Sequence, residues 1–236
     1  MCSSDLLSPA FPEGRALRTA VIRGAGFVRL AGLSALPALA LAGPVRIMRG
    51  ALDRARGLTV LVLVGATGWL AVTATRYVSS QFVGNYVIHD GALSIAVLPG
   101  TRPPVMPGAL WDLLVLIASL AGILLLVAAV PTIAGLIDRL RRRDATDLDL
   151  VTGLLGLTVA GYAAAYGLAA VTGLQVYDRY ALPALPLISV LLLRATGATR
   201  GDRVGRPRTA IAAVALAGLA VVGVDLAVDS ASFDGA

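Results

Sequence analysis

Apolar residues fill long stretches of this chain, without the regular return of polar positions that marks a helix on the surface of a soluble protein. A bilayer core about 30 Å thick needs about 20 apolar residues in a helix, and six stretches come close to that length. They are residues 26–43, 58–75, 109–137, 150–173, 181–196 and 209–228. The pattern predicts an all-α fold, a polytopic bundle of about six transmembrane helices in a membrane domain over residues 7–236.

Two of these six stretches carry breaks. The first contains Arg29 and is interrupted by Pro37, so we expect a half-helix there or the end of a longer span. The fifth is short and starts with Pro183 and Pro186, which suit the first turn of a helix because its N–H groups have no partner in the helix.

The composition agrees with a membrane protein: 57% of the residues are hydrophobic, 14% are charged, and the mean hydropathy is +0.82. The only cysteine, Cys2, and the only histidine, His89, exclude a disulfide framework and a zinc site built from Cys and His. No cofactor is identifiable, and a need for a divalent metal stays open. The net charge of +6 comes from Arg clusters between apolar runs, where they orient helices against a bilayer, so nucleic acid is not an expected partner.

The arginines are distributed unevenly between alternate connections. Thirteen lie in three connections, and the alternate ones hold only Arg76, Arg102 and Arg179. The thirteen are Arg46, Arg49, Arg54, Arg56, Arg139, Arg141, Arg142, Arg143, Arg194, Arg200, Arg203, Arg206 and Arg208. The positive-inside rule makes this group cytoplasmic. It predicts a protein of the cytoplasmic membrane, with the loop 76–108, the segment 174–180 and both chain ends outside.

Both ends of the chain favour a fragment of a longer protein. Residues 1–6 resemble a translated sequencing adapter, which predicts an artefact, and the last residues are polar and follow an apolar helix directly. A complete small protein is the alternative.

The first outer loop is long enough to carry a function. It holds Asn85, Tyr86, His89 and Asp90, which are possible contacts for a ligand. A single His is more often an ordinary surface residue than a base or a ligand, and that interpretation stays open.

The second outer segment contains Tyr177, Asp178, Arg179 and Tyr180 just before the prolines. In one interpretation the tyrosines are belt aromatics and Arg179 is an interfacial anchor paired with Asp178. In the other, Arg179 precedes a helix N-terminus, where the guanidinium and the free N–H groups together favour a phosphate. The second interpretation predicts a site for a phosphate head group at the outer face.

The string Tyr177-Asp178-Arg179-Tyr180-Ala-Leu-Pro183-Ala-Leu-Pro186 resembles the aromatic-x-Arg-Tyr-x-x-Pro-x-x-Pro signature of GT-C type membrane glycosyltransferases. This group includes dolichyl-phosphate-mannose-protein mannosyltransferase-like and aminoarabinose-transferase-like enzymes. The segments Phe82-Val-Gly84-Asn85-Tyr86 and Phe233-Asp234-Gly235-Ala236 are similar to actinobacterial members. The resemblance covers roughly residues 20–236.

The resemblance implies transfer of a sugar from a polyprenyl-phosphate donor to an acceptor at the outer face of the cytoplasmic membrane. Arg179 and Tyr180 carry over as residues of the donor phosphate and its pocket. In that family the general base is an acidic residue of an early outer loop, and none of Asp90, Asp112, Asp178 and Asp225 matches it by position. The catalytic residue is therefore unknown, and the chain alone is expected to be inactive.

Two other classes of protein remain as alternatives. A transporter places ionisable groups deep inside its spans, and here only Arg29 is a candidate. A structural membrane subunit would use small residues for close helix packing, and Gly153, Gly156, Gly161 and Gly167 offer them.

Overall fold

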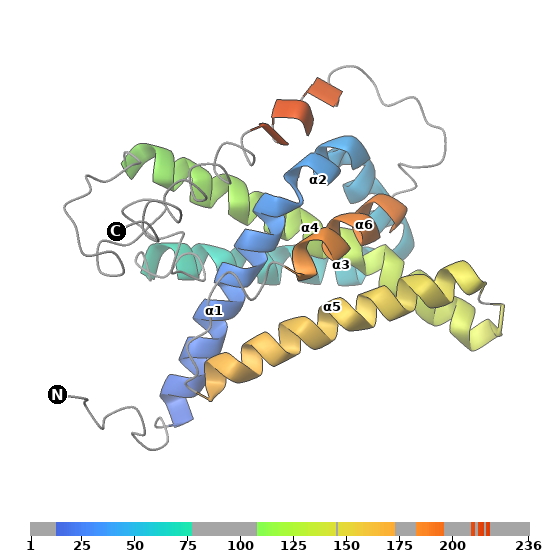
Figure 1. Ribbon diagram of the computed structural model, residues 1–236, viewed down its shortest axis with the longest axis horizontal. Coiled ribbons are helices and arrows are strands. Elements are labelled where there is room, and N and C mark those ends of the chain that lie inside the picture. The colour runs from blue at the N-terminus through green and yellow to red at the C-terminus, as the bar shows by residue number, and fades with distance from the viewer. Residues whose placement is uncertain are drawn as a thin grey trace, which may run out of the picture.

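The computed structural model describes residues 13–76, 108–144, 146–172, 183–195, 209–210, 212–214 and 216–217. These residues form helices and turns, with no strand among them, which confirms the all-α prediction (Figure 1). The helices are α1 (Glu13–Ser34), α2 (Leu36–Ala42), α3 (Pro44–Arg76), α4 (Gly108–Arg142), α5 (Asp147–Val171) and α6 (Ala184–Ala195).

Three helices, α3, α4 and α5, are long and apolar enough to cross a bilayer. A fourth span is present if α1 and α2, bent by 60° at their junction, count as one. The chain is therefore a membrane protein with three or four candidate spans in the part that the structure describes. Helix α6, at 12 residues, is shorter than a full span. The predicted stretch 209–228 lies largely outside the described residues.

The break in the first predicted span lies at Ala35, two residues before Pro37. Pro37 falls in the first turn of α2, where its missing N–H leaves no helical hydrogen bond unmade. Helix α1 begins at Glu13, well before the predicted residue 26, so Arg29 lies inside a helix of 22 residues. Helix α2 ends at Gly43, whose φ of 84° is accessible mainly to glycine, and Pro44 then starts α3.

Residues 44–57, which the sequence places between two spans, are helical and form the first part of α3. Ile47 and Ala51, one turn apart, are buried, and the polar face with its arginines stays exposed, so an amphipathic pattern supports the helix despite its charges. The helix kinks at Ala55, whose φ and ψ are −151° and 59°. Beside the kink, the buried hydroxyl of Thr59 donates to the carbonyl of Ala51 at 2.9 Å, eight residues earlier. The hydroxyl of Thr59 thus provides a donor for the carbonyl of Ala51, next to the irregular turn.

A tight turn joins α4 to α5. The N–H of Arg143 donates to the carbonyl of Leu140, and the N–H of Asp144 donates to the carbonyl of Arg139, which is the Schellman pattern. Arg143 has a φ of 58°, so a residue other than glycine occupies the left-handed position. Thr146 then starts α5 with a capping box to Asp149. Arg139, near the end of α4, pairs with Asp149, near the start of α5. This ion pair holds the end of one helix against the start of the next.

Helices α1 and α4 cross at two glycines. A Cβ at Gly32 would lie 2.3 Å from the backbone N of Gly122, and a Cβ at Gly122 would lie 2.9 Å from the carbonyl oxygen of Val28. Only glycine permits this approach of two backbones. The glycines for which the sequence suggested such packing lie elsewhere. A Cβ at Gly153 would meet only the side chain of Leu136, and Gly156, Gly161 and Gly167 have open space around them.

Candidate functional sites

The residues predicted to form the site lie outside the described residues. These are Asn85, Tyr86, His89 and Asp90 of the first outer loop, and Tyr177, Asp178, Arg179 and Tyr180 of the second outer segment. On the C-terminal side of the second segment, Pro183 is an exposed turn residue, and α6 begins directly after it at Ala184. The helix start predicted at the two prolines is thus present, with Pro186 in its first turn.

The first residue of α6 is anchored in the bundle. Ala184 is fully buried in a cluster with Phe27 of α1 and Tyr166 of α5. The rings of Phe27 and Tyr166 stack at a tilt of 43° with their centroids 5.3 Å apart, a geometry that aromatic pairs favour. Contacts among α1, α5 and α6 therefore fix the start of α6, just after the predicted phosphate-binding segment.

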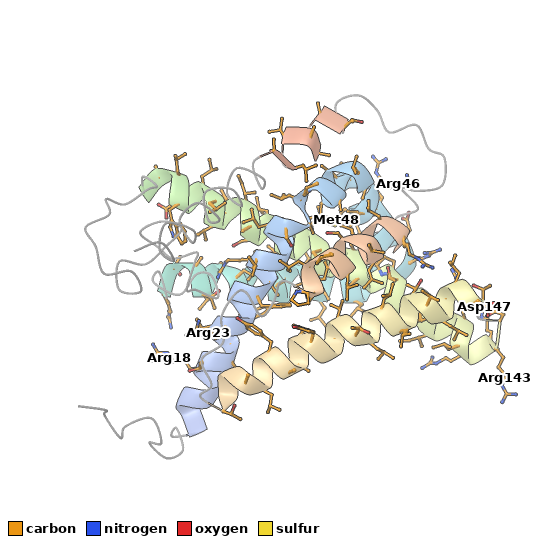
Figure 2. All side chains as sticks on the ribbon, viewed as in Figure 1. Arg18, Arg23, Arg46, Met48, Arg143 and Asp147 are labelled. Atoms are coloured by element: carbon orange, nitrogen blue, oxygen red, sulfur yellow. The ribbon has the colours of Figure 1, made fainter. Side chains whose placement is uncertain are left out.

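The segments that carry most of the described arginines gather on one side of the molecule. Arg54 of α3 lies with Arg139 and Arg142 of α4 around one hollow, and Arg194 of α6 donates to the carbonyl of Leu148 in α5 at 2.9 Å. Figure 2 shows Arg46, Arg143 and Asp147 on this side, and Arg18 and Arg23 of α1 on the opposite side. We call the first side the arginine-rich end. The start of α6 lies away from this end, because α6 runs toward Leu148.

Arg29 is the buried charge inside the bundle, with 0% of its surface exposed. Its Nε donates to Ser119 Oγ of α4 at 3.0 Å. Its Nη2 donates to the carbonyl of Leu70 and to Thr73 Oγ1 of α3, both at 2.7 Å. Thr73 in turn donates to the carbonyl of Trp69 at 2.9 Å. One guanidinium thus joins three helices, which is how a charge in a bilayer is compensated.

The sequence identified Arg29 as an unusual residue but gave no indication of its partners. Ser119 and Thr73 are hydroxyl residues in apolar helices, where such residues commonly bond to their own backbone. Their approach to Arg29 depends on the crossing of α1 with α3 and α4, over sequence separations of 44 and 90 residues. In the sequence, these contacts were indicated only by one polar residue in each of three apolar runs: Arg29, Thr73 and Ser119.

A hollow of about 240 Å³ lies at the arginine-rich end, between the kink of α3 and the last turns of α4. The charged side chains around it are Arg54, Arg139, Arg142, Asp138 and Asp144. Across the described residues, no group of His, Cys, Asp and Glu has the arrangement of a metal site. The hollow therefore offers charged side chains of both signs for binding.

No family model, curated protein or solved structure matches this chain.

Proposed function

We propose that this chain is part of a membrane glycosyltransferase, which moves a sugar from a polyprenyl-phosphate donor to an acceptor at the outer face of the cytoplasmic membrane. The observation that carries the proposal is the arginine-tyrosine-proline motif together with the helix directly after it. Helix α6 begins immediately beyond Pro183, and its first residue is buried between Phe27 and Tyr166.

This arrangement suits a phosphate. A helix N-terminus presents unpaired N–H groups and the positive end of its dipole, and Arg179 lies five residues before Ala184 in the sequence. A donor lipid cannot leave the bilayer cheaply, since each buried CH₂ contributes about 0.8 kcal/mol, so the enzyme must meet the phosphate at the membrane surface. In this proposal the fixed start of α6 lies at that surface and holds the cationic segment beside the phosphate.

The proposal includes the topology: six spans, with the arginine-rich end in the cytoplasm and the motif outside. Cysteine labelling tests it after Cys2→Ser removes the native thiol. An impermeant reagent added from outside should label Ser94→Cys and should label Ala145→Cys only after the membrane is permeabilised. The reverse pattern would refute both the orientation and the outer phosphate site.

Donor binding tests the role of Arg179. Arg179→Ala should weaken binding of a polyprenyl-phosphate sugar by about 10- to 100-fold, because a charge-assisted hydrogen bond contributes about 1.5 to 3 kcal/mol. Arg179→Lys should recover only part of the loss, since an ammonium lacks the planar fork of the guanidinium. Arg76→Ala, which removes an exposed arginine at the end of α3, is the control.

The opposite interpretation of Arg179, as an interfacial anchor, makes different predictions for the same variants. Lysine would substitute fully, and Arg179→Ala would lower the amount of protein in the membrane without changing donor affinity. Unchanged donor affinity at equal abundance would contradict the proposed phosphate site.

A transporter is the second candidate, because Arg29 is an ionisable side chain inside a span. Its hydrogen bonds to two other helices hold it in place, which favours a role in packing. If the protein is a transporter that depends on this charge, an Arg29→Gln variant that keeps its fold should lose transport. The native protein should then show no sugar transfer.

A further inference from the structure

The hollow at the arginine-rich end lies where a helix passes from apolar to charged. Helix α4 carries no charged residue from Leu113 through Ile137, and Asp138 begins its charged end. Ala134 and Gly135 also line the hollow, and a Cβ at Gly135 would meet no atom within 4 Å. Arg54 comes from the turn of α3 that precedes the kink at Ala55. The hollow therefore lies where α4 passes from an apolar to a charged composition, as expected of a helix at the level of lipid head groups.

Three arginines and two aspartates face this hollow. Arg139 is already paired with Asp149, on the far side of the turn. Arg54, Arg142, Asp138 and Asp144 remain, and no ion pair joins any of them to another described residue. The balance of charge does not favour a purely anionic ligand, because each carboxylate would repel it.

The chemistry that fits both signs is a phosphate with a primary ammonium a few bonds away. Guanidinium groups bind phosphate oxygens through two parallel hydrogen bonds. Carboxylates accept hydrogen bonds from an ammonium group, which carries three donors. A phosphate joined to an ammonium by a two-carbon chain places both charges within one head group.

We propose that this hollow binds the head group of a phosphatidylethanolamine lipid. Arg54 and Arg142 take the phosphate, Asp138 and Asp144 take the ammonium, and the acyl chains run along the apolar part of α4. The site lies away from the start of α6 and is independent of glycosyl transfer. It gives the protein a preference for one lipid of its own membrane, at the point where α3 is kinked.

Native mass spectrometry of the purified full chain tests the proposal, with equimolar phosphatidylethanolamine, phosphatidylglycerol and phosphatidylcholine of the same acyl chains. Phosphatidylethanolamine should be retained most. Phosphatidylcholine shares its charges, but its quaternary nitrogen has no N–H donor for the carboxylates. Equal or greater retention of phosphatidylglycerol by the native protein would overturn the proposal.

Substitutions separate the two halves of the site. Arg54→Gln and Arg142→Gln should each lower retention of phosphatidylethanolamine about fivefold, the upper range for an exposed ion pair. The double variant Asp138→Asn, Asp144→Asn should lose the preference and bind phosphatidylglycerol at least as well. Arg49→Gln, which removes an exposed arginine of the same helix outside the hollow, is the matched control and should bind like the native protein.

Two further measurements keep the result interpretable. Thermal unfolding of each variant shows whether its fold is intact, and an intact Arg54→Gln, Arg142→Gln double variant with native lipid retention would overturn the proposal. Free phosphoethanolamine is the second arm. Displacement of the lipid by this soluble compound at equal concentration would assign the site to a soluble ligand and contradict the lipid assignment.

Discussion

Helices α4 and α5 are consecutive in the chain, yet they relate to the rest of the molecule in opposite ways. In the apolar window of α4, 44% of the residues are buried inside the protein, and in that of α5 none is. Leu154, Leu157 and Leu168 of α5 expose 65% or more of their surface. Helix α4 lies between α1 and α3, whereas α5 runs along the outside of the bundle (Figure 1).

The difference shows that apolar composition selects a helix for the membrane but does not decide what it packs against. Lipid chains are as apolar as leucine, so an exposed leucine in a span carries no penalty. What distinguishes α4 is a glycine that lets α1 approach, a serine that accepts from Arg29, and small residues facing the neighbouring helices. Helix α5 is attached instead through the turn to α4, through Tyr166 and through the partly buried Val159.

The largest effect is expected at the crossing of α1 and α4. Gly32→Ala should lower the free energy of unfolding by about 3 kcal/mol, because the new methyl group would overlap the backbone of Gly122 and force the helices apart. Gly156→Ala on α5, where the space is open, should leave stability unchanged or slightly raised. Unfolding of the detergent-solubilised protein by sodium dodecyl sulfate measures both. Equal effects of the two substitutions would remove the distinction between the helices.

A smaller effect is expected at the buried guanidinium. Thr73→Val should cost about 2 kcal/mol, because Arg29 stays buried and loses one acceptor. Thr158→Val on α5 is the matched control, since the hydroxyl of Thr158 is exposed and bonds only to its own helix, at Leu154. Its cost should stay below about 0.5 kcal/mol.

Arg29 itself provides a check on this interpretation. In an Arg29→Met background the Thr73→Val substitution should become nearly neutral, because no charge is left without its partner. The coupling is read from a double-mutant cycle of unfolding free energies. Additive effects would show that Thr73 contributes through its own helix and not through Arg29.

How well the sequence predicts these features depends on whether they arise from neighbouring residues or from contacts between distant ones. The bounds of α4 and α5 lie within about five residues of the predicted spans, because long apolar runs and the charged turn between them are local signals. The start of α3 was missed because the run from Pro44 to Arg56 is too charged to be a span, yet Ile47 and Ala51 give it one apolar face.

Features that depend on contacts between distant residues were not predictable. Gly32 and Gly122 differ from the other glycines only in what lies opposite them, 90 residues away in the chain. The partners of Arg29 depend on the same crossing. The predicted phosphate-binding residues lie outside the described part of the chain, so their role rests on the motif and on the buried start of α6.

The smallest effect is expected where α5 is joined to α4. Arg143→Gly should raise the free energy of unfolding by up to about 1 kcal/mol, because the left-handed conformation at this position costs a residue with a Cβ roughly that much. The gain should appear as a later midpoint in the same detergent titration. Arg141→Gly, two residues earlier and still helical, is the control and should lose stability.

The turn between α4 and α5 also has a consequence for how the protein enters the membrane. Residues 138–149 carry eight charged side chains, and each would cost about 2.5 to 3.5 kcal/mol at the centre of a bilayer. The turn therefore stays on the side of the membrane where it first lies. Neither α4 nor α5 can then reverse its direction without the other. Arg139 and Asp149 are only ten residues apart, so their pairing closes a short loop. The end of α4 and the start of α5 are therefore joined as soon as the start of α5 is synthesised, and α6 is added to two helices that are already oriented.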